Sequence, residues 1–288
     1  MLECVVNLSE GRDGGLLEEL AAAAGSCLLD VHTDAHHHRS VFTLAGAQVE
    51  LAVRTLATNA VARIDLSHHD GVHPRIGAVD VVPFVPLAGS DLVDAIAARN
   101  RFASWAAAEL ALPCFLYGPE RTLPELRRSA FSVLAPDVGP LRPHPTGGAV
   151  AVGARGVLVA FNLWLAPGLA VDAARRVAAA IRGPALRTLG LDVGGRAQVS
   201  CNLVEPAVLG PSAVYDLVAA QVEVDRAELV GLLPASILSA VPSERWRELD
   251  LDENRTIEGR LDKAGLDGPE HGGGADGDDG GSAGRGRR

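Results

Sequence analysis

The sequence lacks the features that mark several common classes of protein. Its only cysteines are Cys4, Cys27, Cys114 and Cys201, with no CxxC pair among them, so neither a disulfide framework nor a thiolate zinc site is expected. No apolar run approaches the roughly 20 residues that span a bilayer. The start, MLECVVNLSEGRD, has neither the basic region nor the long apolar region of a signal peptide. We therefore expect a cytoplasmic protein that does not enter a membrane.

Basic residues are fewer than acidic ones, 26 against 36, so the net charge of the 288 residues is −10. This balance argues against a nucleic-acid surface and favours small-molecule partners. Aromatic residues make up only 4% of the chain although 48% of it is apolar, so Ala, Val and Leu must form most of the core. The length allows one large domain or two small ones.

Two sets of elements follow one another along the chain, separated by a Pro/Gly-rich connector at 135–150. Apolar periodicity predicts strands at 2–8, 27–33, 39–46, 80–87 and 113–118, and again at 156–165, 186–193, 197–204 and 227–234. Helices are predicted at 16–25, 47–64, 90–112, 168–183 and 212–224. Each half can be written βαββαβ, the split βαβ or ferredoxin-like plan. We expect two α+β subdomains, 1–155 and 156–262, and a disordered Gly-rich tail at 263–288.

Histidines gather in two predicted loops, at 36–38 and at 68, 69 and 73. Together with Asp30, Asp34 or Asp70 they could supply ligands for a metal. However, three consecutive histidines cannot all point the same way, and no HExxH spacing places two ligands on one helix face. Metal binding is therefore the less favoured interpretation, and loop histidines without a role are the alternative for the triplet.

His73 differs from the other histidines because of its neighbours in HHDGVHPRIGAVD. Pro74 fixes its own φ and biases His73 toward an extended conformation. An imidazole has a pKa near neutrality, and a rigidly placed one suits a general base. A surface histidine in a capped turn is the alternative that this motif alone leaves open.

Several segments resemble a known family, the glutamate formimidoyltransferases, also called formiminotransferases. They occur in the family's order over residues 3 to about 262, and the longest are the most specific. The segments are ECVVNLSEGR (3–12), LLDV (28–31), HPRIGAVDVVPFVP (73–86), GPLRPHPTGGA (139–149), GARGVLVAFNLWL (153–165), QVSCNLV (198–204) and ELVGLLP (228–234). The resemblance covers the N- and C-terminal formiminotransferase subdomains, and the Gly-rich tail is too short for the family's fused cyclodeaminase domain.

The resemblance implies two subdomains around a folate-binding groove. It also implies transfer of a formimidoyl group from N-formimidoyl-L-glutamate to N5 of tetrahydrofolate in histidine degradation. Tetrahydrofolate would be a co-substrate, no metal is expected, and a homodimer is possible. The histidine of the HPR motif is the family's catalytic base, which places this role on His73. The connector that contacts folate corresponds to Gly139, Pro140, Leu141, Arg142, Pro143, His144, Pro145, Thr146, Gly147 and Gly148.

Further residues are candidates for substrate contacts. Arg39, Arg75 and Arg142 could bind the carboxylates of the substrates. Asn7, Ser9 and Glu10 belong to the first motif and could contact the substrate or hold the backbone of the site. Helix capping is an equal alternative for the serine and the glutamate.

The chain departs from the family pattern at several positions. His32 stands where members commonly have Asp, His36–His38 replace a loop without histidine, and Gly147 replaces a tryptophan. The segment between Tyr117 and Gly139 is also shorter than usual. These departures leave three alternatives open: a folate-dependent transferase of the same fold with a different one-carbon donor, a metal-dependent hydrolase that uses the His-rich loops, and a non-catalytic ligand-binding protein.

Overall fold

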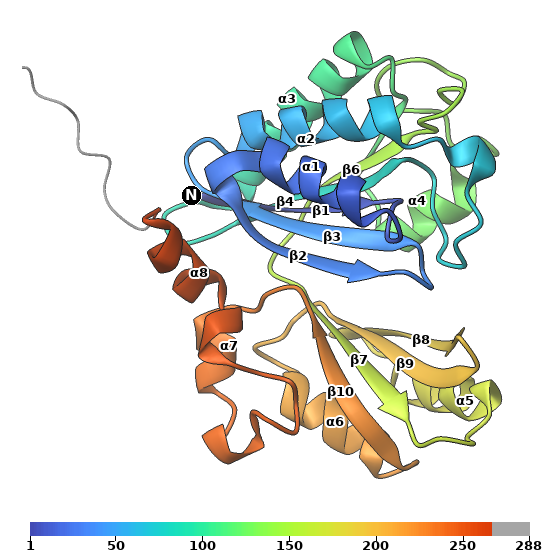
Figure 1. The fold of residues 1–288 in the computed structure, drawn as a ribbon, viewed down its shortest axis with the longest axis vertical. Helices are drawn as coiled ribbons and strands as arrows, with labels where there is room; N and C mark the ends of the chain where they lie inside the picture. Colours follow the sequence, from blue (N-terminus) through green and yellow to red (C-terminus); the bar gives the residue numbers. More distant parts are fainter. Residues whose placement is uncertain (267–288) are drawn as a thin grey trace, which may run out of the picture.

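The computed structural model of the chain describes residues 1–266, which form two lobes, each a β-sheet with helices on its outer face (Figure 1). The strands of the first lobe are β1 (Leu2–Leu8), β2 (Leu28–Asp34), β3 (Arg39–Ala45), β4 (Val79–Pro86), β5 (Cys114–Tyr117) and β6 (Val150–Ala154). Its helices are α1 (Gly14–Ala24), α2 (Val49–Arg63), α3 (Leu92–Glu109) and α4 (Leu123–Ser129). The second lobe contains β7 (Val159–Leu165), β8 (Leu186–Val193), β9 (Arg196–Leu203), β10 (Val224–Val230), α5 (Val171–Ile181), α6 (Pro211–Ala219), α7 (Ala235–Ser239) and α8 (Ile257–Ala264). Short 3₁₀ helices occur at Gly25–Cys27, Leu66–His68, Ser243–Arg245 and Glu253–Arg255.

Both sheets contain the predicted split βαβ unit. The elements β1-α1-β2-β3-α2-β4 give the strand order β2-β3-β1-β4, and β7-α5-β8-β9-α6-β10 give the equivalent order β8-β9-β7-β10. These strands are antiparallel to their neighbours. The predicted fold class, α+β with two ferredoxin-like subdomains, is confirmed.

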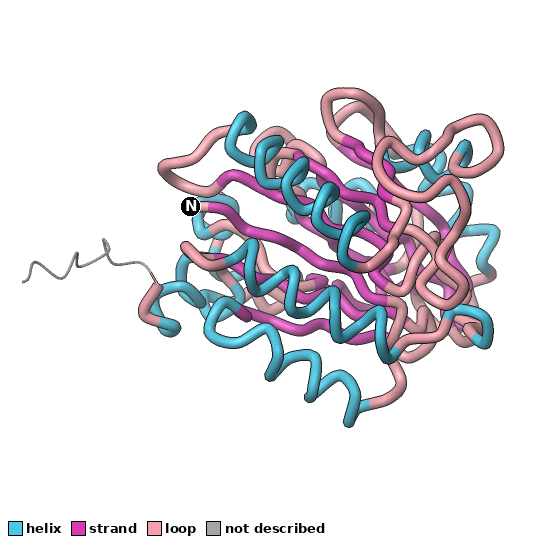
Figure 2. The backbone as a smooth tube through the Cα atoms, turned by 90° about the horizontal axis from the view of Figure 1, so that it is seen from above, coloured by secondary structure: helices cyan, strands magenta, loops and turns pink. Residues whose placement is uncertain are grey.

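The first sheet is larger than the sequence indicated. Beyond β4 it continues with β6 and β5, which run parallel to β4 and to each other, and α3 makes the crossover. Seen from above, helices lie across the strands (Figure 2). Residues 150–154 lie next to the Pro/Gly-rich connector, and this buried strand was not among those predicted from the sequence. Helix α4 was not predicted either, although Thr122 and Glu125 form a capping box and a proline stands in the first turn.

Residues 263–266, the first four of the predicted tail, are ordered. Helix α8 extends through Ala264 and ends at Gly265, which has a positive φ of 67°. Leu266 packs against a small cluster that also contains Leu29 and Leu261. The remainder of the predicted tail lies outside the described residues.

The two sheets face each other, because α1, α2 and α3 cover the far side of the first sheet and α5 and α6 cover the far side of the second (Figure 1). Alternation along β1 shows the consequence. Cys4, Val6 and Leu8 belong to the core beneath the helices, whereas Glu3 and Asn7 point toward the second lobe. Every second residue of the strand therefore faces the space between the lobes.

Candidate active site

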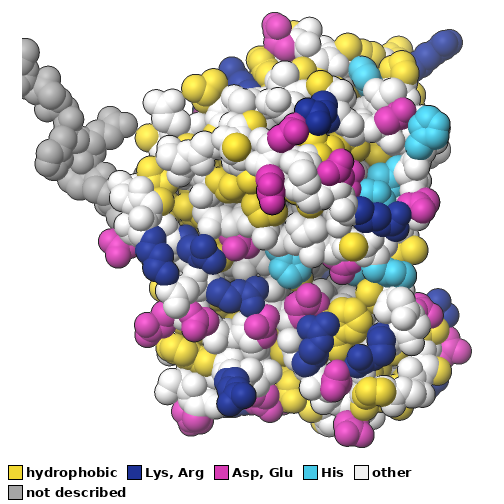
Figure 3. Space-filling model, viewed as in Figure 1, with side chains coloured by type: hydrophobic (Ala, Val, Ile, Leu, Met, Phe, Trp, Pro, Cys, Tyr) yellow, Lys and Arg dark blue, Asp and Glu magenta, His cyan; other side chains and the backbone are white. Residues whose placement is uncertain are grey.

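A cavity of about 230 Å³ lies between the two sheets. One wall is formed by the inner faces of β1, β3 and β4 with the loop that carries His73, and the other by residues of β7 and β9 such as Asn162 and Asn202. In the space-filling view the surface is hollowed where the lobes meet, and histidines gather above this line (Figure 3). Charged groups in its wall include Glu3, Asp34 and Arg39.

His73 lies in the cavity wall because its loop is fastened to the sheet a few residues further on. The Ser9 hydroxyl and the Ser9 backbone N–H donate to the carbonyl oxygens of Gly77 and Ala78, each over 2.8 Å. A Cβ atom at Gly77 would lie 1.8 Å from the Ala149 carbonyl oxygen, so only glycine allows this close approach. The anchored glycine therefore fixes the loop against the start of β6.

The tautomer of His73 follows from its hydrogen bond. Its Nδ1 lies 2.8 Å from the Pro74 carbonyl oxygen, which can only accept, so Nδ1 carries the proton in the neutral ring. This assignment leaves Nε2 as the acceptor nitrogen. The neutral side chain thus has one basic nitrogen free to receive a proton.

The charge state of His73 differs from that of an ordinary histidine. Burial, together with the positive charges of Arg39 and Arg127, lowers the pKa of His73 to about 3. Asp80 and the Pro74 carbonyl act in the opposite direction without restoring it. The imidazole is therefore neutral near pH 7, as a general base must be before it accepts a proton.

We expect an NMR titration of imidazole nitrogens to show His73 neutral at about pH 5, below the usual histidine pKa of about 6.5. Arg127→Gln removes one of the charges that disfavour the imidazolium, so this variant should raise the pKa of His73. Arg128→Gln is the matched control, because Arg128 lies on the same helix but is exposed. Equal His73 titration curves in the two variants would contradict the electrostatic account.

Two arginines and one aspartate form a buried ionic group beside His73. The Asp80 carboxylate is fully buried and accepts from Arg39 over 2.6 Å, from Arg127 over 2.5 Å and from the Ile76 backbone N–H over 2.7 Å. Arg39 also donates to the Asn7 side-chain oxygen over 2.8 Å. The group carries a net charge of about +1, so it suits a carboxylate ligand in the cavity.

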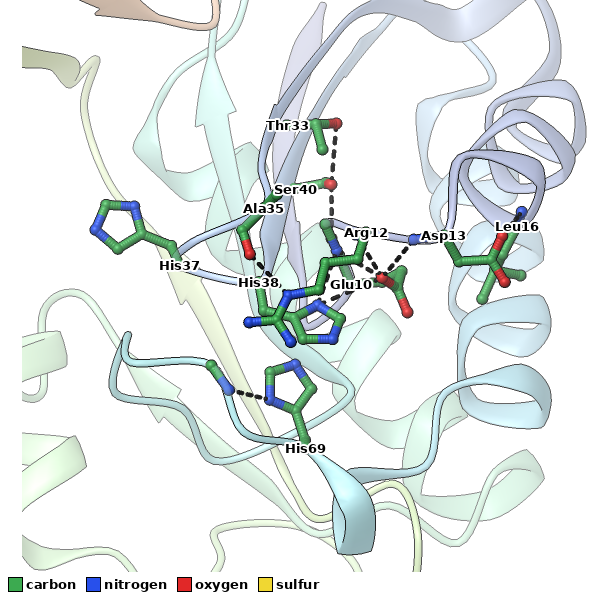
Figure 4. A network of polar contacts seen from close by, with 12 residues as sticks. Glu10, Arg12, Asp13, Leu16, Thr33, Ala35, His37, His38, Ser40 and His69 are labelled. Carbon is green, nitrogen blue, oxygen red and sulfur yellow. Dashed lines mark hydrogen bonds and ion pairs between the residues drawn. The ribbon is translucent and has the colours of Figure 1, made fainter. Parts of the chain in front are cut away.

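Glu10 stabilises the turn that leads into α1 and does not line the cavity. Its Oε1 accepts from the backbone N–H groups of Gly11, Arg12 and Asp13 over 2.7–3.0 Å (Figure 4). The N-cap of α1 is Asp13, whose side chain accepts from the Leu16 N–H. Neither Ser9 nor Glu10 is therefore the cap residue of α1. Both side chains instead make hydrogen bonds to backbone groups of neighbouring loops.

Arg75 joins the two His-rich loops. Its guanidinium donates to the carbonyl oxygens of His37, His38 and His73 over 2.9–3.1 Å and lies 2.7 Å from His69 Nε2. It does not line the cavity. The guanidinium therefore holds the two loops together and does not point into the cavity.

The three consecutive histidines point to different partners. His36 Nε2 accepts from the Gly194 N–H of the second lobe over 3.1 Å, and the His38 ring lies 4.1 Å from the His69 ring. His37 turns away from the network of Figure 4, pairs with Asp34 over 3.0 Å and lies 5.8 Å from the His73 ring. Only His37 of the triplet lines the cavity.

His32 lies in the cavity wall, whereas the connector lies outside the cavity. His32 lines the cavity and lies 3.7 Å from Glu228 on β10, which also accepts from the Trp164 indole over 2.8 Å. Residues 139–148 run along the outside of the first lobe, and none of them lines the cavity. The connector nevertheless touches the His73 loop, because Gly77 and Gly148 form a β-bridge. Arg142 is exposed.

Within residues 1–266, no group of three or more His, Cys, Asp or Glu side chains is arranged to hold a metal ion. Over the same residues, no helix has the length and apolar character needed to cross a membrane.

Among the acidic and basic side chains of the cavity wall, Glu3, Arg127 and Arg155 were not sequence candidates. Asp80 was also missed, although it stands inside the HPRIGAVD motif. A charged residue inside a continuous apolar strand is a usable signal, since a buried charge needs a partner. That signal would have identified Asp80, and the TLPE capping box would have identified the helix of Arg127.

The structure defines an α+β protein with a cavity between two ferredoxin-like subdomains. Residues 1–155 match the family model of the formiminotransferase domain, N-terminal subdomain. The chain is 34% identical to a glutamate formimidoyltransferase of Streptococcus pyogenes serotype M1, over 89% of this chain and 97% of that protein. It therefore belongs to the formiminotransferase family.

Two further relatives differ in length. The chain is 29% identical to a glutamate formimidoyltransferase of Thermoplasma acidophilum, over 92% of this chain and 98% of that protein. It is 31% identical to a formimidoyltransferase-cyclodeaminase of Sus scrofa over 93% of this chain, which spans only 57% of that longer protein.

Proposed function

We propose that this chain transfers the formimidoyl group of N-formimidoyl-L-glutamate to N5 of tetrahydrofolate and releases L-glutamate. The observation that carries the proposal is a neutral imidazole, His73, in a cavity beside the cationic group of Arg39, Arg127 and Asp80. The names of the full-length relatives from Streptococcus pyogenes and Thermoplasma acidophilum support it.

The proposed chemistry needs one proton carrier. N5 of tetrahydrofolate attacks the formimidoyl carbon and forms a C–N bond, and its proton passes to Nε2 of His73. The resulting imidazolium returns this proton to the glutamate nitrogen as the bond between that nitrogen and the formimidoyl carbon breaks. Protons balance, because the proton lost by N5 leaves with glutamate.

The arginines bind and orient in this scheme. Formimidoylglutamate brings two carboxylates, and Arg39 and Arg127 offer the donors nearest to His73. A bound carboxylate would offset the two positive charges that lower the pKa of His73, so the imidazole would become a stronger base when substrate is present. Binding and activation of the base are thus coupled.

The test is a turnover assay with tetrahydrofolate and two donors, formimidoylglutamate and formylglutamate. We expect product only, or at least far faster, from the formimidoyl donor. Faster turnover of formylglutamate would favour a folate-dependent transferase with a different one-carbon donor. Folate binding without turnover of either donor would favour the non-catalytic ligand-binding alternative.

Activity should survive exhaustive dialysis against a chelator, because the proposed steps use a side-chain base and two organic substrates. The measurement is kcat before and after dialysis, together with metal analysis of the purified protein. Recovery of activity only after a divalent ion is added would support the hydrolase alternative, with ligands from the His-rich loops.

The cytoplasmic location and the homodimer also stay predictions. Light scattering after gel filtration would measure the assembly state, and a mass near twice 29.9 kDa is the expected result.

A further inference from the structure

Glu3 is a buried carboxyl that opens into the cavity without a partner. It lies on β1 with 4% of its surface exposed, and it lines the cavity on the same face of the strand as Asn7. Within residues 1–266 its side chain makes no hydrogen bond and no ion pair. Asp34 pairs with His37 and Arg39 pairs with Asp80 in the same wall, so Glu3 differs from both.

A buried carboxylate without a partner is unfavourable. Burial raises the pKa of Glu3 to about 7, against the lowering effect of the Arg155 charge and with a smaller raising effect from Glu258. A hydrogen-bond donor offsets the cost of burying an acceptor, and a ligand with N–H groups would provide such donors. The backbone cannot move the carboxyl elsewhere, because β1 is hydrogen-bonded on both sides, to β3 and β4.

Glu3 lies at a distance from the end of the cavity that contains His73, and β1 spans this distance. Glu3 precedes Asn7 by four residues, which places their Cα atoms about 13 Å apart. Asn7 holds Arg39, and Arg39 is close enough to His73 to lower its pKa. The surroundings of Glu3 are instead Arg155 and apolar groups such as Ile257. The cavity thus has the Arg39, Arg127 and Asp80 group at the His73 end and a carboxyl beside Arg155 at its other end.

We propose that Glu3 binds the pyrimidine edge of the tetrahydrofolate pterin by accepting hydrogen bonds from N3–H and the 2-amino group. The proposal rests on the proposed function, which places N5 at His73. N5 and the carbon that carries the folate tail lie at one end of the bicyclic ring, and the two donors lie at the other. Two parallel N–H donors match the two oxygens of a carboxylate.

The size of the cavity agrees with this orientation. Sites that enclose a whole drug-sized ligand have volumes of roughly 300–1,000 Å³, whereas this cavity measures about 230 Å³. It suits the pterin ring alone, with the tail leaving at the His73 end. The connector is bridged to the His73 loop there and is exposed at Gly139 to Pro143, so it is available to the tail.

The test measures the dissociation constant of 5-formyltetrahydrofolate for wild type, Glu3→Gln and a control, Glu50→Gln. Glu50 lies on α2 outside this cavity and pairs with Arg101. Glu3→Gln keeps the shape but replaces one acceptor by a donor, so we expect affinity to fall roughly 10- to 100-fold, as for lost hydrogen bonds to a charged group. The control should bind like wild type, and the KM for formimidoylglutamate should stay within threefold in both variants.

A ligand without the 2-amino group tests the same contact without any mutation. Wild type should bind a 2-desamino-2-methyl folate about tenfold or more weakly than its parent, and Glu3→Gln should discriminate little between the two. Equal binding of both ligands by wild type would overturn the proposal. A rise in the KM for formimidoylglutamate with unchanged folate affinity would overturn it too, since Glu3 would then face the donor. Glu3-dependent folate binding without any transfer would instead refute the proposed reaction and leave this contact intact.

Discussion

His73→Ala should lower kcat by roughly 10²–10⁴, the usual contribution of a positioned acid/base. The variant removes the one nitrogen that the account assigns to the proton of N5. The dissociation constant for 5-formyltetrahydrofolate should change little, because the imidazole contributes to proton transfer rather than to holding the pterin. Steady-state kinetics and a binding titration on the same preparation measure both quantities.

His68→Ala is the matched control for this variant. His68 lies in the same loop region, but 85% of its side chain is exposed, and its contacts are with its neighbours Asp65 and Ser67. Its kcat should stay near that of wild type. If His73→Ala keeps kcat within about threefold while the control loses activity, the base is misassigned. Added imidazole should restore part of the activity of His73→Ala and none of the activity of an inactive variant at another position.

Asp80→Asn should be the most destabilising single change in the site. The substitution keeps the size of the side chain but removes the negative charge that faces Arg39 and Arg127, so two arginines remain without their counter-charge. Breaking a buried ion pair in this way costs about 3–5 kcal/mol of the free energy of unfolding. For a protein of this size we expect the Tm to fall by roughly 10 °C.

An exposed pair provides the comparison for the stability measurement. Glu19→Gln removes the same charge from a pair with Arg63, whose side chains are 60% and 52% exposed. Such pairs contribute only about 0–1 kcal/mol, so the Tm should barely move. Equal losses in denaturant unfolding of the two variants would show that the Asp80 group is not a structural centre of the site.

The periodicity of the sequence was sufficient for both split βαβ units. In β1 and β3 successive side chains alternate between the core beneath the helices and the cavity, so these strands could be predicted. The strand β6 was missed because its five buried residues follow directly on a Pro/Gly-rich connector. A short apolar run does not distinguish a strand from the end of a loop.

The site was harder to predict than the fold, because its groups come together only through tertiary structure. His73 carried a local signal in Pro74 and the glycines around it. Arg127 is 47 residues from Asp80 and reaches it only because α4 packs beside the parallel strands β5 and β6. Glu3 has the sequence signature of an ordinary polar residue at the start of a strand, and its burial in the cavity wall appears only in the tertiary structure.

The most direct test of the central claim is a single turnover of the wild-type protein with tetrahydrofolate and formimidoylglutamate labelled with ¹³C in the formimidoyl carbon. The account predicts that the label appears as 5-formimidoyltetrahydrofolate and that one glutamate is released for each labelled folate. Label that appears only in formate or formamide, or glutamate released without tetrahydrofolate, would show hydrolysis instead of transfer and would contradict the account.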